Sequence, residues 1–500
     1  MTPEEIAAMQ EENRRLKALV ADLLPLQDLV TQLLPLREQV GQQALLIAQL
    51  QQQVQALQER AGKDSHNSHL PPSSNRFVRQ PRSLRKKSGK KSGGQPGHEG
   101  TTLRWQACPD EVVVHAVTHC AACQQDLQAI AALQIEWRQV VDVPTPRLWV
   151  VEHQAEQKQC PVCQHVTLAC FPTEVAAPLQ YGPRLGAIAV YLVQQQLLPW
   201  ARACEILGDL LGAPLSEGTL ASLIERCAQT LQPVEEQIKQ ALTAVEVLHQ
   251  DETGLYVNGQ RQWLHVSSTD QLTHYAVHPK RGKAALDAID ILPHFAGTSV
   301  HDGWRAYFHY ACQHALCVVH LLRELTYLAE EQGLTWAADL IALLLDMKAA
   351  TDQARAQGLA SMHPLEVADW QAQFVALVTQ ADATTPYAQA PPGHKGRVKQ
   401  SAARNLLDRL LTEQQAVLAF LHRLEVPFDN NQAERDVRMV KVQQKVSGSF
   451  RSPAGAAAFC RIRGYVSTLR KQGLHLLGAL EATLRGHPIL PSFESSSSPE

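Results

Sequence analysis

Residues 245–269 carry the pattern that most limits how this 500-residue chain can fold, because their apolar residues recur at every second position. Such a period of two is typical of β-strands with one buried face. VEVLHQD and GLYV predict strands before Asn258-Gly259, and RQWLHVSST predicts the strand that returns after it. Since Asn-Gly is a strong signal for a tight turn, we predict an antiparallel hairpin closed by these two residues.

The segments that follow extend the pattern in a definite order. LTHYAVHP predicts a third strand, residues 283–291 a helix, and GTSVHD a further strand. HALCVV is strand-like, and residues 320–331 have the spacing of a helix. Three antiparallel strands, a helix and a further strand match the start of a ribonuclease H-like fold. We therefore predict the first part of such a domain over residues 244–330 and its second part over residues 427–487.

Three acidic residues lie where these elements end or begin. Asp251 follows the strand VEVLHQ, Asp302 ends the strand GTSVHD, and Glu434 lies one turn inside a predicted helix in DNNQAERDVRMVK. Carboxylates at strand ends and at a helix start can meet around metal ions, and hard cations such as Mg²⁺ need carboxylate oxygens. The pattern therefore predicts a site for two Mg²⁺ (or Mn²⁺) ions, which Asp251 bridges while Asp302 and Glu434 each help to hold one.

Each acid also has an ordinary structural interpretation. Asp302 begins an Asp-Gly pair, which is common in turns, and Asp251 could cap a loop. Asn431 could be the N-cap of the helix, with Glu434 closing a capping box and Arg438 as its ion-pair partner. The joint arrangement with the zinc-type and basic segments described below favours the metal site.

The predicted helix around Glu434 also has a basic face. Residues three, four and seven positions apart are neighbours on a helix. One stripe therefore contains Glu434, Arg438, Lys441 and Lys445. Lys441 would project beside the metal ions, where a phosphate backbone must pass, so we predict that it contacts DNA. The alternative is a solvated surface lysine.

The cysteines indicate a second metal site. The chain has eleven cysteines and no secretory signal, which favours metal binding over a disulfide framework. Two CxxC pairs suit tetrahedral zinc in a zinc-ribbon-like module over residues 105–172. A predicted β-hairpin around Pro144 and Pro146 would bring the two pairs together. The predicted Zn²⁺ ligands are Cys120, Cys123, Cys160 and Cys163. Alternative ligands are Cys108, His119, His165 and Cys170.

The first 62 residues have the heptad pattern of a coiled coil. One apolar position recurs at Leu26, Leu33, Val40, Ile47 and Val54, and the other at Leu29, Leu36, Gln43, Leu50 and Leu57. Pro25 and Pro35 interrupt this pattern, and an interior proline costs about 3 kcal/mol of helix stability. We therefore predict a continuous leucine zipper only from Pro35 onward, and through it a dimer or higher homo-oligomer. The alternative is a helix that packs on its own protein.

Residues 63–104 read as a flexible basic linker, rich in Ser, Pro and Gly and without enough apolar residues for a core. Residues 65–98 contain no acid. The bases there are Arg76, Arg79, Arg82, Arg85, Lys86, Lys87, Lys90 and Lys91. We predict that this basic arm contacts DNA phosphates, although the overall net charge is only -3. The alternative is a solubilising tether.

The remaining segments are predominantly helical. Residues 178–235 contain helices and a Gly-Ala-Pro turn followed by Ser216 as an N-cap, a pattern that suits either a helix-turn-helix or plain helix packing. Residues 331–426 predict a helical insertion, and residues 488–500 a disordered tail. No segment has the apolar length of a membrane span, so we expect a cytoplasmic protein with no membrane partner.

In these features the sequence resembles the insertion sequence 66 transposases of bacteria, which belong to the DDE class. The resemblance rests on NSHLPPSSN, KKSGGQPGHEGTTL, the paired CxxC motifs, DETGLYVNGQRQWLHVSST, AVHPKRG, SVHDGW, CVVHLLREL and DNNQAERDVR. It implies that Asp251, Asp302 and Glu434 are the catalytic triad and that the two CxxC pairs bind zinc. It also implies that Cys317 and His320, a CxxH motif after the second acid, brace the site.

The resemblance therefore implies a multidomain α+β transposase, associated with the bacterial nucleoid, that binds its element ends and catalyses metal-dependent strand cleavage and strand transfer. The implied partners are double-stranded DNA at the ends and at the target, further copies of the chain, and accessory transposition proteins. One alternative is a DNA-binding regulator derived from a transposase with an inactive ribonuclease H-like domain. Another is a structure-specific nuclease. Three intact carboxylates favour an enzyme over the regulator, and the zipper and end-binding modules count against the nuclease.

Overall fold

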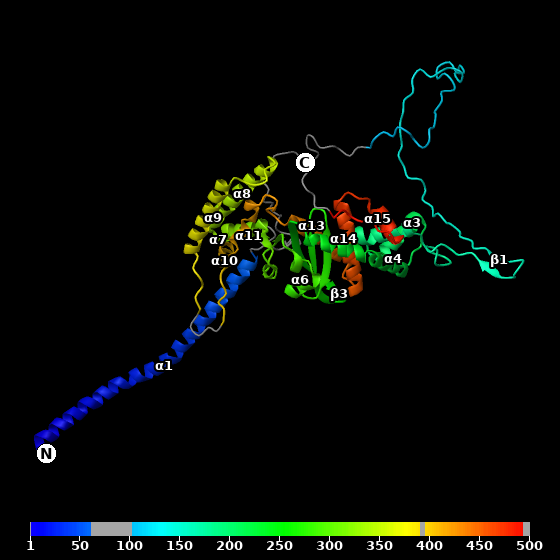
Figure 1. The fold of residues 1–500 in the computed structure, drawn as a ribbon. Helices are drawn as coiled ribbons and strands as arrows, with labels where there is room; N and C mark the ends of the chain where they lie inside the picture. The colour runs from blue at the N-terminus through cyan, green and yellow to red at the C-terminus, as the bar shows by residue number, and fades with distance from the viewer. Residues whose placement is uncertain (1, 62–102, 391–395, 494–500) are drawn as a thin grey trace. The chain divides into compact units, whose positions relative to one another are not determined.

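The computed structural model describes residues 2–61, 103–390 and 396–493 (Figure 1). The chain is divided into two compact units. One unit contains the sheet and comprises residues 85–319, 347–371 and 410–500, and the other comprises residues 1–84, 320–346 and 372–409. Helices and a mixed sheet are both present, as the sequence predicted. The basic arm from Arg76 to Lys91 lies outside the described residues.

The sheet has five strands in the order β5-β4-β3-β6-β7. Strands β3, β4 and β5 pair in an antiparallel manner, whereas β6 runs parallel to β3, and β7 parallel to β6. The strands are β3 (Val247–Val257), β4 (Gln260–Ser268), β5 (Thr273–His278), β6 (Thr298–His301) and β7 (Gln313–Leu316). Strand β3 is therefore the junction between an antiparallel and a parallel half.

The predicted hairpin turn is confirmed. Val257 pairs with Gln260, and Asn258 and Gly259 between them have φ angles of 49° and 72°, which Asn and Gly tolerate best. The two strands predicted before this turn are one continuous strand, because the residues between them stay paired with β4. The strand-like HALCVV is also shorter than predicted, since a helix already begins at Val318.

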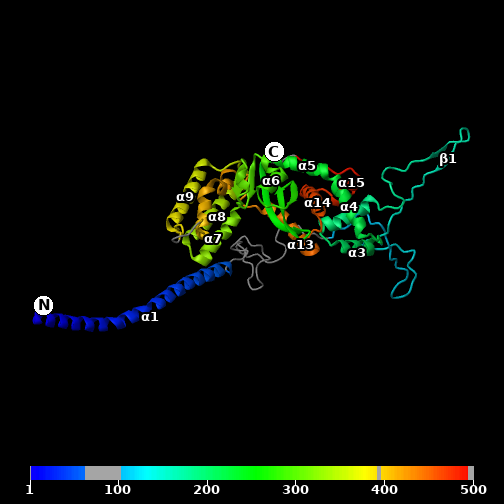
Figure 2. The same ribbon diagram turned by 90° about the horizontal axis from the view of Figure 1, so that it is seen from below.

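Each face of the sheet packs on helices. Helices α13 (Asn431–Ser447) and α14 (Pro453–Lys471) bury apolar residues against one face, where Leu255 and Leu264 meet Val437 and Phe459. A second core contains Leu248 and helix α6 (Lys283–Ile289). Figure 2 shows α6, α13 and α14 around the strands. The central strand β3 is therefore packed on both faces, which fixes the positions of its side chains.

Helices that precede the sheet extend this second core. They are α2 (Pro183–Val190), the π-helix η2 (Tyr191–Gln195), α3 (Trp200–Leu211), α4 (Glu217–Thr230) and α5 (Gln232–Thr243). The predicted cap at Ser216 is confirmed, since its side chain accepts the N–H of Thr219 at 3.1 Å. The apolar face of α4 is buried in this core together with residues of α14 and α15 (Leu476–Leu484). These helices thus pack in a core, and the helix-turn-helix stays a prediction.

Helices also occupy the long segment between β7 and α13. They are α7 (Val318–Gln332), α8 (Thr335–Ala356), α9 (Pro364–Thr384), α10 (Ala402–Thr412), α11 (Gln414–Val417) and α12 (Ala419–His422). Arg404 of α10 is 1% exposed, and its guanidinium forms ion pairs with Asp382 at 2.6 Å and Asp408 at 2.8 Å. This cation also stacks on the ring of Tyr387. Two carboxylates thus compensate one buried charge.

Helix α1 (Pro3–Ala61) is continuous over 59 residues and includes Pro25 and Pro35. The two prolines therefore do not interrupt the helix, whereas a leucine zipper from Pro35 onward stays a prediction. Each proline removes one backbone hydrogen bond, but the flanking Leu, Gln and Glu residues are strong helix formers that carry the helix past it. Leu36 is 54% exposed, and Leu19 and Leu50 are exposed as well.

The segment with the CxxC pairs contains one small sheet, in which β1 (Gln157–Gln159) pairs with β2 (Val166–Leu168). The hairpin predicted around Pro144 and Pro146 does not form, so that prediction is wrong. Side chains of the predicted strands lack a surface to pack on, since Val140 is 92% and Trp149 83% exposed. An alternating apolar pattern stabilises strands only where one face is buried.

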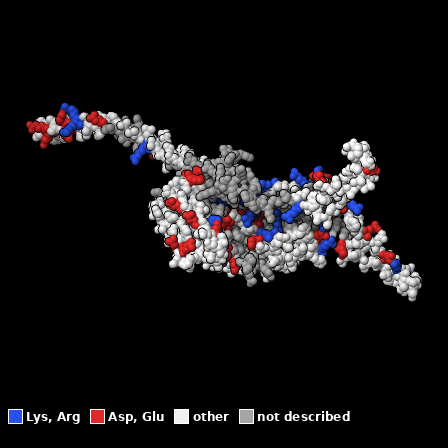
Figure 3. All heavy atoms as spheres, turned by 90° about the horizontal axis from the view of Figure 1, so that it is seen from above, with Lys and Arg blue, Asp and Glu red and all other residues white. Residues whose placement is uncertain are grey.

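The C-terminal segment is bound to the core as far as the structure describes it. Ser492 donates its N–H to the side chain of Gln472, and Tyr465 donates its hydroxyl to the carbonyl of Ile489. Residues 494–500 lie outside the described part of the chain. Among the described residues, no helix has the length and apolar character needed to cross a membrane. Lys and Arg are interspersed with Asp and Glu on the face shown in Figure 3.

Candidate functional site

The pairing of β3 with β6 brings two of the predicted acids together. His249 pairs with Val300 in these parallel strands, so two further residues along each strand place Asp251 beside Asp302. Strand β6 ends at His301, directly before Asp302. Both carboxylates thus lie just beyond the paired residues of β3 and β6, at the carboxyl end of β6. The spacing of the acids in the sequence could not predict this register between β3 and β6.

Asp251 lies in a strongly negative environment. Burial raises its pKa well above the usual range, and the carboxylates of Glu252, Asp302 and Glu434 raise it further. The N–H of Glu252 donates to Asp251 Oδ1 at 2.8 Å, which opposes this shift. All the charges that act on Asp251 most strongly are negative. A buried carboxylate among other carboxylates is the arrangement expected of a site that takes a cation.

Glu434 reaches this site because Asn430 holds the start of α13 against β3. The Asn430 side chain donates to the carbonyl of Gln250 at 2.7 Å and lies 2.8 Å from Nδ1 of His249. Its backbone N–H donates to Sγ of Cys317 at 3.2 Å. Asn430 is 181 positions from His249, so no local sequence pattern indicated this clamp. It places the first turn of α13, and Glu434 with it, beside the strand that carries Asp251.

The capping box considered from the sequence is not formed. The N-cap of α13 is Asn430 rather than Asn431, and its side chain forms no cap hydrogen bond. The reason is that the Asn430 side chain instead contacts Gln250 and His249 of β3. Asp429 instead accepts the N–H of Asn431 at 3.0 Å. The interpretation of Glu434 as part of a capping box with Asn431 is therefore wrong.

A second contact braces α13 from its far side. Lys471 of α14 forms an ion pair with Asp436 at 2.9 Å and donates to the carbonyl of Thr269 at 2.7 Å. Tyr275 of β5 donates its hydroxyl to the carbonyl of Asp436 at 3.0 Å. The helix that carries Glu434 is thus fixed to the sheet at two places.

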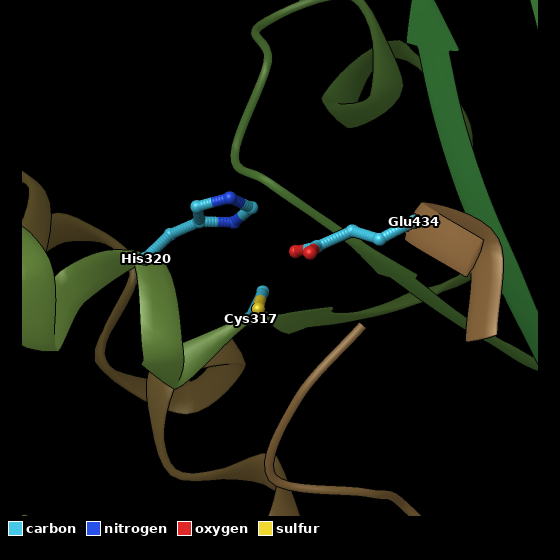
Figure 4. A group of neighbouring side chains, drawn as sticks. All are labelled: Cys317, His320 and Glu434. Carbon is cyan, nitrogen blue, oxygen red and sulfur yellow. The ribbon is translucent and has the colours of Figure 1, made fainter. Parts of the chain in front are cut away.

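Cys317, His320 and Glu434 offer ligand atoms that all lie within 4.8 Å of one another. Figure 4 shows the three side chains pointing toward a common point. Cys317 follows β7 directly, and His320 lies in the first turn of α7. A thiol, an imidazole and a carboxylate are ligand types that bind zinc. The CxxH spacing was the sequence signal for two of these residues, and its implied role was to brace the site.

The two CxxC pairs form matching turns. The N–H of Gln124 donates to the carbonyl of Cys120 at 3.0 Å, and that of Gln164 to the carbonyl of Cys160 at 2.9 Å. Gln124 and Gln164 both have left-handed backbones, with φ angles of 60° and 61°. Both turns therefore have the same local geometry, although their sequences share only the cysteines and the following Gln.

These turns favour thiolates. The backbone N–H of Cys123 lowers the pKa of Cys120, and that of Cys163 lowers the pKa of Cys160. Such N–H groups stabilise a negative sulfur, which is the form that binds zinc. In the part of the chain that the structure describes, however, the four thiols are not gathered into one group. Each pair is thus preformed, whereas the four-ligand zinc site stays a prediction.

Glu252, Arg281 and Tyr307 form a buried network next to Asp251 that sequence analysis missed. The Nε and Nη2 atoms of Arg281 lie 2.8 and 2.7 Å from Oε1 of Glu252, and Tyr307 donates its hydroxyl to Oε2. The Glu252 side chain is only 2% exposed. The motif AVHPKRG contained Arg281, but nothing in the sequence linked it to Glu252.

Lys441 of α13 contacts β3 beyond Asp251. Its Nζ donates to the carbonyl of Gly254, three residues after Asp251, and lies 3.4 Å from the side-chain oxygen of Gln444. Burial lowers the pKa of Lys441, and the charge of Arg261 lowers it further. Three residues of a strand span about 10 Å, so Lys441 flanks the predicted metal site rather than entering it.

Comparison with known families supports the sequence resemblance. The model of the transposase IS66 family matches residues 178–458, which contain all three predicted catalytic acids. A second model, described as a family of unknown function (DUF6444), matches residues 2–104. No curated protein matches the chain. Because the first match covers more than half of the sequence and includes the whole five-stranded sheet, this chain belongs to the transposase IS66 family.

Proposed function

We propose that this transposase binds the ends of its insertion sequence and catalyses metal-dependent DNA strand cleavage and strand transfer with Asp251, Asp302 and Glu434. One observation carries the proposal: the β3–β6 register sets Asp251 beside Asp302. The strand order β5-β4-β3-β6-β7 supports a ribonuclease H-like fold for this part of the chain. The helices from 331 to 426 would then be an insertion between the two halves, 244–330 and 427–487.

The donor set suits Mg²⁺ or Mn²⁺. Its three carboxylates offer hard oxygen ligands, and burial among like charges raises the pKa of Asp251. Bound divalent ions would relieve charge on the scissile phosphate and activate the attacking oxygen. Asp251, Asp302 and Glu434 would hold these ions.

The protein side chains have distinct tasks in this proposal. Arg281 and Tyr307 occupy both oxygens of Glu252, which keeps this fourth carboxylate out of the ligand set. Asn430 fixes the helix that carries Glu434. Lys441 would hold a phosphate of the DNA strand at the flank of the site.

The proposal assigns DNA binding to several segments. The basic arm, from Arg76 to Lys91, would contact phosphates without reading sequence. A zinc ion on Cys120, Cys123, Cys160 and Cys163 would fold residues 105–172 into a module that recognises the ends. The helices over residues 178–235 would contribute a helix-turn-helix, and residues 1–62 would join copies of the chain through a coiled coil.

Incubation of the full-length protein with end-containing DNA tests the proposal. With Mg²⁺, the wild-type protein should nick the element end and join it to a target duplex, and Ca²⁺ should support binding only. Asp251→Asn should bind the same DNA without cleaving it. A wild-type protein that binds ends tightly but never cleaves them with Mg²⁺ or Mn²⁺ would instead identify a regulator.

A further inference from the structure

Four side chains form a continuous stack of alternating cations and aromatic rings beside the carboxylates. The guanidinium of Arg261 lies 4.7 Å from the ring centre of Trp263, and that of Arg281 lies 4.9 Å from the same ring. Arg281 also lies 4.0 Å from the ring centre of Trp304. This Arg-Trp stack comprises Arg261, Trp263, Arg281 and Trp304.

The stack is rigid at its centre because Arg281 is fixed by Glu252. The two contacts of Arg281 with Oε1 of Glu252 involve both Nε and Nη2, which sets the plane of the guanidinium. Tyr307 in turn fixes the other carboxylate oxygen. A planar cation held in this way presents a fixed surface to the ring of Trp304.

Trp304 is tied to the predicted catalytic acid Asp302. Its backbone N–H donates to Oδ1 of Asp302 at 2.9 Å, two residues earlier in the chain. Its side chain packs on Arg281, yet Trp304 remains 38% exposed. A large ring is therefore held next to the carboxylate site with part of its surface open.

The other end of the stack, Arg261, lies beside a second cation, Lys441. A Cβ built on Gly254 of β3 would be 3.3 Å from Nε of Arg261, so the Arg261 side chain packs closely over this glycine from the neighbouring strand β4. The carbonyl of the same Gly254 accepts Nζ of Lys441. Two like charges held around one glycine favour a polyanion such as a phosphate backbone.

We propose that Trp304 stacks on a nucleobase that has left the duplex next to the scissile phosphate, that Arg281 positions this ring, and that Arg261 and Lys441 hold the phosphates of the same strand. An aromatic ring with adjacent cations is the chemistry that binds an unpaired nucleotide, because every base offers a flat face and every linkage a negative charge. This inference rests on the proposed function. A base that leaves the duplex beside the cleavage position loses its stacking partners, and a ring held next to Asp302 would replace one of them and stabilise the open form.

A binding experiment tests the stacking directly. End DNA with an unpaired 2-aminopurine beside the cleavage position is mixed with full-length protein in Ca²⁺. Wild-type protein should quench most of the emission, Trp304→Phe should retain quenching, and Trp304→Ala should bind the DNA but leave the emission high. Equal quenching by wild type and Trp304→Ala would overturn the proposal.

Cleavage rates separate a stacking role from a structural one. With Mg²⁺, Trp304→Ala should cleave a fully paired end about ten-fold more slowly than wild type. On an end with mismatches beside the cleavage position, the same variant should approach the wild-type rate, because the cost of opening the duplex is already removed. Arg281→Lys should show the same dependence on pairing to a smaller degree, since lysine keeps the charge but not the planar surface. An equal loss on both substrates would mean that Trp304 only supports the fold of its loop.

Leu345→Ala is the matched control, since Leu345 is also an exposed apolar side chain but lies on α8. It should match wild type in both assays. The two readouts also separate this inference from the proposed function. Quenching that depends on Trp304 in a protein that never cleaves would retain the stacking and overturn the catalysis. If the protein cleaves normally but neither the quenching nor the cleavage rate depends on Trp304, the catalysis would be retained and the stacking overturned.

Discussion

The carboxylate site and the two CxxC turns are both built from residues that bind metal, but the chain holds them in different ways. Asp251 lies on β3 and Asp302 directly after the adjacent strand β6, in a sheet packed on both faces. Cys120 and Cys160 lie in turns whose surroundings are exposed. In the described part of the chain, neither the four thiols nor Asp251, Asp302 and Glu434 together form one close ligand group.

This difference indicates that metal does different work at each place. At the carboxylates, packing of the sheet and the Asn430 clamp supply the geometry, and a cation would relieve repulsion that the fold has created. At the cysteines, hydrogen bonds within each turn position one pair of thiols. A zinc ion would have to hold the two pairs together and so stabilise the fold of this segment.

The largest effect is expected for the carboxylates. Asp251→Asn, Asp302→Asn and Glu434→Gln should each lower strand transfer by at least about a thousand-fold, because removal of one ligand disrupts the geometry of the metal pair. End binding, measured by gel shift in Ca²⁺, should stay near the wild-type value. Asp287→Asn, which changes an exposed acid paired with Lys283, is the control and should retain activity. Near-normal strand transfer by Glu434→Gln would remove Glu434 from the triad.

The second effect is local unfolding without zinc. Elemental analysis should find about one zinc per chain in the CxxC segment, and chelation should expose residues 105–170 to proteolysis and hydrogen exchange. The strands β3 to β7 should keep their protection, because their core does not include this segment. Cys120→Ser should reproduce the chelated state, whereas Cys170→Ser should not. If Cys170→Ser also loses zinc, a ligand of the predicted set has been replaced by Cys170.

The two regions also differ in how much of them could be predicted from sequence. The Asn258-Gly259 turn and the position of Asp302 directly after a strand follow from local pattern, and the structure has them there. Asp251 was expected at a strand end but lies within the continuous strand β3. Asn430 and Arg281 were missed, because their partners are 180 and 29 positions away and depend on tertiary packing. The prediction of a hairpin around Pro144 was wrong because local pattern alone was not enough. The alternating apolar side chains of this segment have no surface on which to pack.

A smaller effect is expected on stability. Burial among carboxylates raises the pKa of Asp251 in the folded protein, so its contribution to stability is complete below its unfolded pKa, near 3.8. That contribution is lost as the pH rises through the folded pKa. Without metal at pH 7, Asp251→Asn should therefore raise the melting temperature by a few degrees, about 1 kcal/mol in free energy of unfolding. Mg²⁺ should stabilise the wild type more than this variant, and a lower melting temperature for metal-free Asp251→Asn would contradict a repulsive site.

The smallest effect concerns the flank of the carboxylate site. Lys441→Ala should remove one phosphate contact, which makes the slope of log affinity against log salt shallower by about 0.9 and slows strand transfer at low DNA concentration. Its Nζ already bonds to the Gly254 carbonyl, so the ammonium is held at the edge of β3 rather than free to move over the surface. Zinc content and melting temperature should not change. Lys445→Ala, on the same stripe but in the last turn of α13, is the control. Equal slopes for wild type and Lys441→Ala would assign Lys441 to the solvated face and leave Arg261 as the cation that meets the strand.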